Sequence, residues 1–349
     1  MENERTTRRG FVRETTLTAA GLAMGLDAVT SPTRAADAPQ GGVAKPGPTS
    51  TLVDSSKILN YNPNMEYRRQ GKTGLMVSAV CLGGHSRSDE SERTKIVSRC
   101  IDLGINYIDA CSDYEVKRDA KALAGRRDRM YLALSHCAQE VRNENFRTAK
   151  KLLGSLDELL RESKQDHTDL WRITCFEPGG RHTFDTACEL VNALETAKKQ
   201  GKARFIGFSS HDRRWIKFMI EYFPQIEVVC FPFTTMTKAA PKDSLFAAIK
   251  KCDVGAFGIK PFAAGSLFSG EKDEDFQRAR LAIRYILHSN TVLPIPGIHS
   301  IAEADNLSRA VMERREFDVH EKTAFHAMSH NLWDRLPDHY QWLRNWEYV

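Results

Sequence analysis

The fold is decided by residues 104–115, which read Gly104-Ile105-Asn106-Tyr107-Ile108-Asp109-Ala110-Cys111-Ser112-Asp113-Tyr114-Glu115. The first half is short, apolar and rich in β-branched and aromatic residues, which is typical of a buried strand in a parallel sheet. Asp109 stands where this strand ends, and Tyr114 follows in the loop. Because α/β folds keep their chemistry at the carboxyl ends of parallel strands, Asp109 and Tyr114 are candidate site residues. The alternative is an ordinary surface turn.

The rest of the chain repeats this strand pattern. Strand-like apolar runs occupy residues 77–82, 105–110, 130–135, 169–174, 204–209, 228–233, 256–260 and 292–296. Helical patterns separate most of them, for instance over residues 146–163, 185–200 and 275–288. We therefore expect an α/β fold, a (β/α)₈ TIM barrel. A doubly wound open sheet is the alternative, but no Gly-x-Gly-x-x-Gly follows the first strand.

Two further elements frame the predicted barrel. A β-hairpin that turns at residues 71–74 precedes it. A helical tail ends the chain, and its aromatic residues are expected to cover the barrel or border its mouth: Trp333, Tyr340, Trp342, Trp346 and Tyr348.

The N-terminus has the pattern of a targeting segment. Arg8 and Arg9 form a twin-arginine motif, a weakly apolar stretch covers residues 17–29, and small residues at 36–38 resemble a cleavage site. We predict a twin-arginine signal peptide over residues 1–38, a flexible linker over 39–62 and the barrel over 63–349. The protein would then be exported already folded to the periplasm by the twin-arginine machinery. A disordered basic tail is the alternative.

The composition of the chain argues against nucleic acid as a partner and against a membrane span. Hydrophobic residues make up 41% of the chain and charged residues 27%, with a net charge of +5. No basic run is interleaved with aromatic residues, so nucleic acid is not expected as a partner. No apolar stretch reaches the length of about 18 residues that a membrane span needs.

Over residues 65–312 the chain resembles the aldo-keto reductase family. The resemblance is carried by the hairpin, by residues 82–84, by the stretch from Gly104 to Tyr114, and by residues 201–210, 260–267 and 295–297. It implies a nicotinamide-dependent oxidoreductase that reduces a small-molecule carbonyl. Its cofactor, NADP(H) rather than NAD(H), would lie across the barrel mouth without a Rossmann domain.

The resemblance also implies a catalytic tetrad, of which half is retained. Asp109 and Tyr114 match the family's aspartate and proton-donating tyrosine. Ser135 stands at the position of the family's lysine, Thr174 at that of its histidine, and Cys230 at that of a glutamine. Without the lysine, the pKa of Tyr114 should stay near its ordinary value of about 10, so reduction would survive better than oxidation.

Two residues are candidates for a substitute cation. Lys260 ends the seventh predicted strand, and His136 follows the vacated lysine position. Strand alternation turns neighbouring residues to opposite faces, which disfavours His136 unless the strand has already ended. Each of these residues is more often an ordinary solvated or hydrogen-bonded side chain.

The cofactor site that the resemblance implies uses the later strands. Two serines match the nicotinamide-binding positions, the loop after the seventh strand matches the pyrophosphate loop, and a helix N-terminus follows for a phosphate. These residues are Ser209, Ser210, Lys260, Pro261, Phe262, Gly265, Leu267, Gly297, His299, Ser300 and Asn306.

Cysteines leave one question open. The eight cysteines contain no Cys-x-x-Cys pair, so no metal site is predicted. Cys111, Cys137, Cys175 and Cys230 nevertheless fall at or just after strand ends on the same mouth. Buried cysteines usually act as small hydrophobic residues, whereas a thiol or metal cluster, or a disulfide, is the alternative.

A second function of a different class also fits the sequence. A barrel that has lost its lysine and histidine can act as an exported ligand- or cofactor-binding protein without catalysis. The retained Asp109, Tyr114 and cofactor loops favour the reductase.

Overall fold

The computed structural model describes residues 54–84, 88–175, 183–237 and 245–348. All of them belong to one compact unit, Ala44–Val349. The predicted signal peptide and residues 39–53 of the predicted linker lie outside this set. Within it, no helix is long and apolar enough to cross a membrane.

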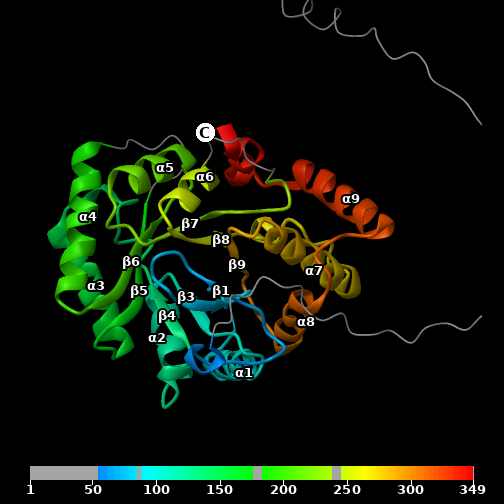
Figure 1. The fold of residues 1–349 in the computed structure, drawn as a ribbon, viewed down its shortest axis with the longest axis horizontal. Helices are drawn as coiled ribbons and strands as arrows, with labels where there is room; N and C mark the ends of the chain where they lie inside the picture. The colour runs from blue at the N-terminus through cyan, green and yellow to red at the C-terminus, as the bar shows by residue number, and fades with distance from the viewer. Residues whose placement is uncertain (1–53, 85–87, 176–182, 238–244, 349) are drawn as a thin grey trace, which may run out of the picture. The chain divides into compact units, whose positions relative to one another are not determined.

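A parallel sheet of seven strands forms the centre of this unit, with the strands side by side in chain order (Figure 1). Most residues of the seven strands are apolar and buried, as expected for strands covered on both faces. The strands are β3 (Tyr107–Ala110), β4 (Tyr131–Leu134), β5 (Thr168–Thr174), β6 (Ala203–Ser209), β7 (Val228–Pro232), β8 (Gly255–Ile259) and β9 (Leu293–Ile295).

Residues 81–83 close the sheet into a barrel between its two edge strands. The Leu82 N–H donates to the Tyr107 carbonyl of β3 (2.9 Å), and the Gly83 N–H donates to the Pro296 carbonyl after β9 (2.8 Å). A Cβ at Gly83 would lie 2.5 Å from that carbonyl oxygen, so only glycine permits the approach. The (β/α)₈ barrel is confirmed.

The first barrel strand corrects one boundary. We expected it over residues 77–82, but Met76–Ser78 is the hairpin strand β2, and only bridge-like pairing at residues 81–83 joins the barrel. An apolar run shared by the end of a hairpin and the start of a barrel strand looks continuous in the sequence.

The hairpin closes the amino-terminal end of the barrel. Its strands, β1 (Tyr67–Arg69) and β2 (Met76–Ser78), pair antiparallel around Gly71 and Gly74, which have φ values of +50° and +68°. Gly71 forms a bridge to Val254, the residue before β8. The predicted hairpin is confirmed, and it leaves the opposite, carboxyl end of the strands open for chemistry.

Helices surround the ring of strands (Figure 1). Helix α3 shows why they form: Leu152, Leu156, Leu159 and Leu160 recur at helical spacing and all face the core. The helices are α1 (Glu90–Asp102), α2 (Asp113–Ala122), α3 (Ala149–Ser163), α4 (Phe184–Lys199), α5 (Arg213–Tyr222), α6 (Leu245–Lys251), α7 (Lys272–His288), α8 (Ile301–Met312) and α9 (Val319–Arg335), with the 3₁₀ segments η1 (Ser55–Lys57), η2 (Arg127–Arg129), η3 (Glu144–Phe146), η4 (Ala263–Gly265) and η5 (Asp338–Tyr348).

A buried ion pair joins α1 to α2. Arg93 Nε lies 2.6 Å from Asp119 Oδ1, and both side chains are fully buried. The same guanidinium donates to the Gly83 carbonyl (3.3 Å) and the Ile298 carbonyl (3.4 Å). It therefore ties the helix pair to two loops at the barrel mouth.

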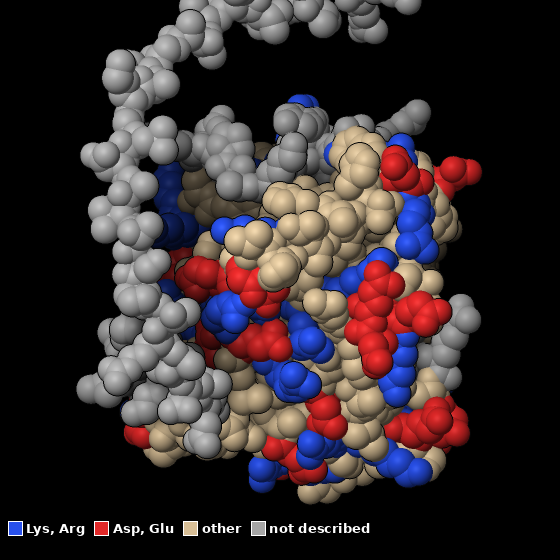
Figure 2. Space-filling view, turned by 90° about the vertical axis from the view of Figure 1, so that its right-hand side faces the viewer, with Lys and Arg blue, Asp and Glu red and all other residues tan. Residues whose placement is uncertain are grey.

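The outer face of α7–α9 carries acidic and basic side chains close together (Figure 2). Arg284 pairs with Glu321 at 2.6 Å, and Arg314 pairs with Asp318 at 2.5 Å. These ion pairs link α7 to α9 and the loop before α9 to the N-cap residue of that helix.

Residues 54–62 are ordered, although they were expected to form the end of the linker. Asn60 Nδ2 donates to the Ile101 carbonyl (2.8 Å), and Asn62 Nδ2 donates to the Asp102 carbonyl (3.0 Å). These side chains satisfy the C-terminal carbonyls of α1, so the structured part of the chain begins by Asp54.

Candidate active site at the carboxyl ends of the strands

A buried ion pair occupies the barrel interior below its mouth. Asp109 of β3 accepts two hydrogen bonds from Arg172 of β5, at 3.1 Å from Nε and 2.5 Å from Nη2. Both side chains are 5% exposed. Burial disfavours the charge on Arg172, but Asp109 outweighs it and holds the arginine pKa well above its usual value. Arg172 is therefore a fixed cation at the centre of the site.

Neither predicted substitute cation takes this place. The Lys260 ammonium lies over the ring of Tyr340, 5.4 Å from its centroid. His136 lies beyond the end of β4, so strand alternation does not constrain it; it is buried and its Nδ1 has no hydrogen-bond partner among the described residues. Arg172 was not among the predicted cations, because the candidates lay only next to the vacated lysine position and at the end of the seventh predicted strand.

Tyr114 lies in the first turn of α2 and is 50% exposed. Its hydroxyl is 3.4 Å from Glu115 Oε1, and the Arg118 guanidinium lies 5.6 Å from its ring centroid. Partial burial and the Glu115 charge raise its pKa above the ordinary value, so the hydroxyl keeps its proton at neutral pH. Among the described residues no hydrogen bond joins this hydroxyl to Asp109 or Arg172.

The vacated tetrad positions are buried beside the ion pair. Ser135 is fully buried, and its hydroxyl has no hydrogen-bond partner among the described residues. Thr174 ends β5, and its hydroxyl lies 3.7 Å from the sulfur of Cys137. Cys230 is buried in β7, which raises its thiol pKa to about 12.

Glu140 is a buried carboxyl that the sequence did not single out. It follows β4 and accepts the Thr174 N–H at 2.6 Å through Oε2, while Oε1 has no partner in the described part of the chain. Burial, partly offset by this hydrogen bond, raises its pKa to about 7. The carboxyl therefore holds its proton to a higher pH than an exposed glutamate does.

The predicted nicotinamide residues lie together at the end of β6. Ser209 ends the strand and Ser210 follows; both are buried. The Ser210 N–H donates to the Cys230 carbonyl (3.0 Å), which fixes the backbone there. The predicted pyrophosphate loop, which contains Pro261, Phe262, Gly265 and Leu267, follows β8 and includes η4.

Of the residues predicted to bind a cofactor phosphate, only some lie together at the N-terminus of α8. Gly297 and His299 lie before α8, and Ser300 is the N-cap of that helix, accepting the Glu303 N–H at 3.1 Å. The Glu303 carboxylate accepts the His299 N–H at 2.9 Å. Asn306 turns toward α7, where Oδ1 accepts from Arg280 (2.6 Å) and Nδ2 donates to the Phe276 carbonyl (2.9 Å).

The C-terminal segment η5 covers part of the mouth. Trp342 stacks on His211, which follows β6, with centroids 4.5 Å apart. Tyr340 lies beneath the Lys260 ammonium after β8. Two of the predicted cofactor loops are therefore in contact with the tail.

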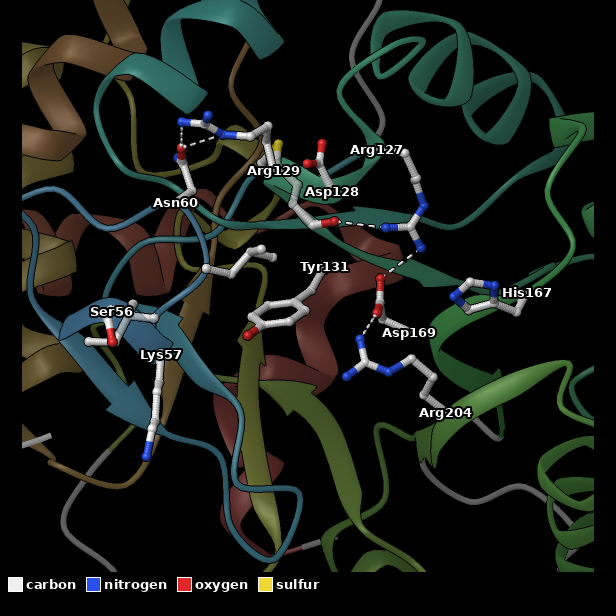
Figure 3. Close-up of a pocket in the computed structure, with 13 residues that line it drawn as sticks. Ser56, Lys57, Asn60, Arg127, Asp128, Arg129, Tyr131, His167, Asp169 and Arg204 are labelled. Atoms are coloured by element: carbon white, nitrogen blue, oxygen red, sulfur yellow. Dashed lines mark hydrogen bonds and ion pairs between the residues drawn. The ribbon is translucent and has the colours of Figure 1, made fainter. Parts of the chain in front are cut away.

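The mouth is distinct from a cavity of about 840 Å³ at the opposite end of the strands (Figure 3). Its lining includes Tyr131, Asp169 and Arg204, which lie within the first two residues of β4, β5 and β6. Asp169 pairs with both Arg127 and Arg204, so one carboxylate is shared by two guanidinium groups. Because barrel chemistry takes place at the carboxyl ends, this cavity is not the candidate active site.

Comparison with known proteins identifies the class. The model of the aldo/keto reductase family matches residues 79–279, more than half of the chain, so the chain belongs to the aldo/keto reductase family. The aldo-keto reductase AKR11C1 from Bacillus halodurans in its holo form has the same fold, with a TM-score of 0.61 and 22% identity over 76% of this chain and 96% of that one.

Two characterised relatives are similar to this chain at low sequence identity. L-Galactose dehydrogenase from Arabidopsis thaliana is 25% identical over 58% of this chain and 67% of its own length. L-Glyceraldehyde 3-phosphate reductase from Escherichia coli (strain K12) is 24% identical over 58% of this chain and 63% of its own length. The chain thus spans about two thirds of these relatives.

Proposed function

We propose that the protein is an NADP(H)-dependent reductase of a small-molecule carbonyl compound, with Tyr114 as the proton donor. Family membership makes it an oxidoreductase. The observation that supports the finer proposal is a half-exposed tyrosine hydroxyl in the first turn of α2, just after the carboxyl end of β3, whose pKa is raised by partial burial and the Glu115 charge.

When bound, the reduced nicotinamide supplies a hydride to the carbonyl carbon. Tyr114 gives its hydroxyl proton to the carbonyl oxygen as negative charge develops there, and the substrate leaves as an alcohol. The tyrosinate then recovers a proton from water, because half of its side chain faces solvent. Only this hydroxyl needs to touch the substrate.

Arg172 plays a different part from the lysine that the family resemblance implies. It neutralises Asp109 inside the barrel, but it makes no hydrogen bond to Tyr114 among the described residues. The surroundings of Tyr114 raise its pKa rather than lower it, even though the Arg118 guanidinium lies over its ring. The site is suited to giving a proton and poorly suited to taking one.

Unpartnered polar atoms at the mouth support a nicotinamide cofactor. Ser135 Oγ and His136 Nδ1 are buried without a partner in the described part of the chain, which suggests that a ligand satisfies them. Ser209 and Ser210 lie at the end of β6, two strands further along the sheet, and would hold the carboxamide. Lys260 would pair with the pyrophosphate.

The preference for NADPH over NADH should be small. A 2′-phosphate at the N-terminus of α8 would meet the Glu303 carboxylate, which already accepts the His299 N–H. Replacing Glu303 by Gln removes this repulsion, so that variant should bind NADPH more tightly while NADH affinity changes little.

A fluorescence titration of the purified mature protein with NADPH and NADH tests the cofactor. We expect micromolar dissociation constants, which correspond to a binding free energy on the order of −8 kcal/mol. Absence of binding by either nucleotide at millimolar concentration would overturn the reductase and leave a barrel that binds another ligand.

We also propose that residues 1–38 direct export by the twin-arginine pathway, which places the enzyme in the periplasm. This proposal rests on Arg8 and Arg9 ahead of a weakly apolar stretch. That pathway carries folded proteins, so the cofactor could be acquired before export.

A further inference from the structure

Two cysteines face each other at the barrel mouth. Cys111 follows β3, and Cys137 lies shortly after β4, the neighbouring strand. The Cys137 N–H donates to the Cys111 carbonyl at 3.3 Å, and the two side chains lie close enough to share a hydrogen bond. The Cys111 thiol also lies within donating distance of Glu115 Oε2, at 3.4 Å. Neither cysteine forms a disulfide in the structure.

The surroundings of the pair are asymmetric. The hydrogen bond from Cys111, the charge of Arg172 and the hydroxyl of Thr174 together lower the Cys137 pKa to about 5, with a smaller contribution from Arg142. The same hydrogen bond, with burial, raises the Cys111 pKa well above its ordinary value. At neutral pH, Cys137 is the thiolate and Cys111 is the thiol, which is the arrangement of a nucleophile with a resolving partner.

The other buried cysteines differ from this pair. Burial raises the pKa of Cys81 and Cys175 well above the ordinary value, and that of Cys100 to about 12. Buried thiols of this kind are inert. Cys137, by contrast, is partly exposed and sits beside a fixed guanidinium.

We propose that Cys111 and Cys137 form a reversible disulfide when a hydroperoxide oxidises Cys137. The Cys137 thiolate attacks one peroxide oxygen, the O–O bond breaks, and the leaving oxygen takes a proton. Cys137 is then a sulfenic acid. Cys111 attacks its sulfur, the hydroxyl leaves as water with the Cys111 proton, and the Sγ–Sγ bond forms. Two thiols are oxidised and one peroxide is reduced.

Disulfide formation would alter the first turn of α2. Glu115 Oε2 accepts the Cys111 N–H at 3.0 Å and lies 3.4 Å from the Cys111 sulfur. Oxidation removes the sulfur from this carboxylate and the negative charge from beside Arg172. Because Tyr114 contacts Glu115, the pair is placed to control the proton donor; this consequence alone rests on the proposed reductase function.

The test is thiol counting and peptide mapping on the reduced full-length protein, before and after addition of one equivalent of hydrogen peroxide. We expect the thiol count to fall by two and a cross-linked peptide to contain Cys111 and Cys137. Dithiothreitol should restore both thiols. This readout needs neither nicotinamide nor carbonyl, so it is independent of the reductase activity.

Single variants separate the two roles. Cys137→Ser should abolish the thiol loss, whereas Cys111→Ser should stop at a sulfenic acid that dimedone traps. Cys188→Ser is the matched control, because Cys188 is exposed on α4 and lacks the basic surroundings. Cys137 should react at least about tenfold faster than Cys188. Equal rates, or a wild-type protein that keeps both mouth thiols after peroxide, would overturn the proposal.

Discussion

At the scale of single residues, the ion pair between Asp109 and Arg172 governs the interior of the site. A charge removed from water must be paired, and breaking a buried pair costs more than the pair contributes. Asp109 accepts both hydrogen bonds from one guanidinium, and the two side chains are each 5% exposed.

Replacing Arg172 by Met should therefore lower the free energy of unfolding by about 3 to 5 kcal/mol, because Asp109 is left buried without a partner. The double variant Arg172→Met with Asp109→Leu should recover much of this loss. Urea unfolding followed by circular dichroism measures both. If Arg172→Met lowers the free energy of unfolding by less than about 1 kcal/mol, the Asp109–Arg172 pair does not govern the interior of the site.

The protonation of Tyr114 predicts the direction of catalysis. Its pKa is raised, so carbonyl reduction should run at neutral pH while alcohol oxidation stays slow and rises only toward pH values above about 10. Ser135→Lys should shift the oxidation profile to lower pH, because the new cation favours tyrosinate. Initial rates against pH measure this, and an oxidation optimum near neutral pH in the wild type would contradict it.

Asp109 and Tyr114 could be predicted because a strand and the loop after it are local features of the sequence. The Asp109–Arg172 pair could not, since it crosses β4 and joins residues far apart in the chain. Asn306 shows the same limit. The family resemblance suggested it for the cofactor site, whereas its side chain bonds to Arg280 and the Phe276 carbonyl.

At the scale of elements, buried strands were easy to locate. Continuous apolar runs bounded by turns placed β3 to β9 within a residue or two of their observed ends. The first barrel strand was misplaced because its run merges with the hairpin. The end of the linker looked unstructured because the asparagines that order residues 54–62 act through long-range hydrogen bonds.

The tail element η5 should compete with the cofactor. Tyr340→Ala with Trp342→Ala frees Lys260 and His211, so NADPH should bind about 2- to 30-fold more tightly, the range expected for losing a cation–π contact. Fluorescence titration measures the change. Trp333→Ala is the control, because Trp333 contacts Arg344 rather than the mouth. Weaker binding in the double variant would mean that the tail belongs to the cofactor site.

At the scale of the whole molecule, the proposed signal peptide and the barrel occupy separate parts of the chain. Residues 1–38 lie outside the described residues, which begin at Asp54, so we expect changes at Arg8 and Arg9 to leave the barrel intact. Its hairpin closes one end, and its chemistry is gathered at the other.

Replacing Arg8 and Arg9 by Lys should leave the precursor in the cytoplasm, because the export machinery requires the arginine pair. Cell fractionation and immunoblotting of the wild type and the double variant measure this. Replacing Arg68, which lies on β1 outside the signal, by Lys should leave export unchanged. Normal export of the double variant would remove the twin-arginine assignment.

The central claim is that Tyr114 donates the proton in an NADPH-dependent carbonyl reduction. The most direct measurement is NADPH consumption and alcohol formation with an activated aromatic aldehyde, for the wild type and for Tyr114→Phe, together with NADPH binding by each. We predict one alcohol per NADPH in the wild type, a loss of about 100-fold or more in Tyr114→Phe, and equal NADPH affinity in both. An undiminished rate in Tyr114→Phe, or a wild type that binds NADPH but reduces nothing, would contradict the account.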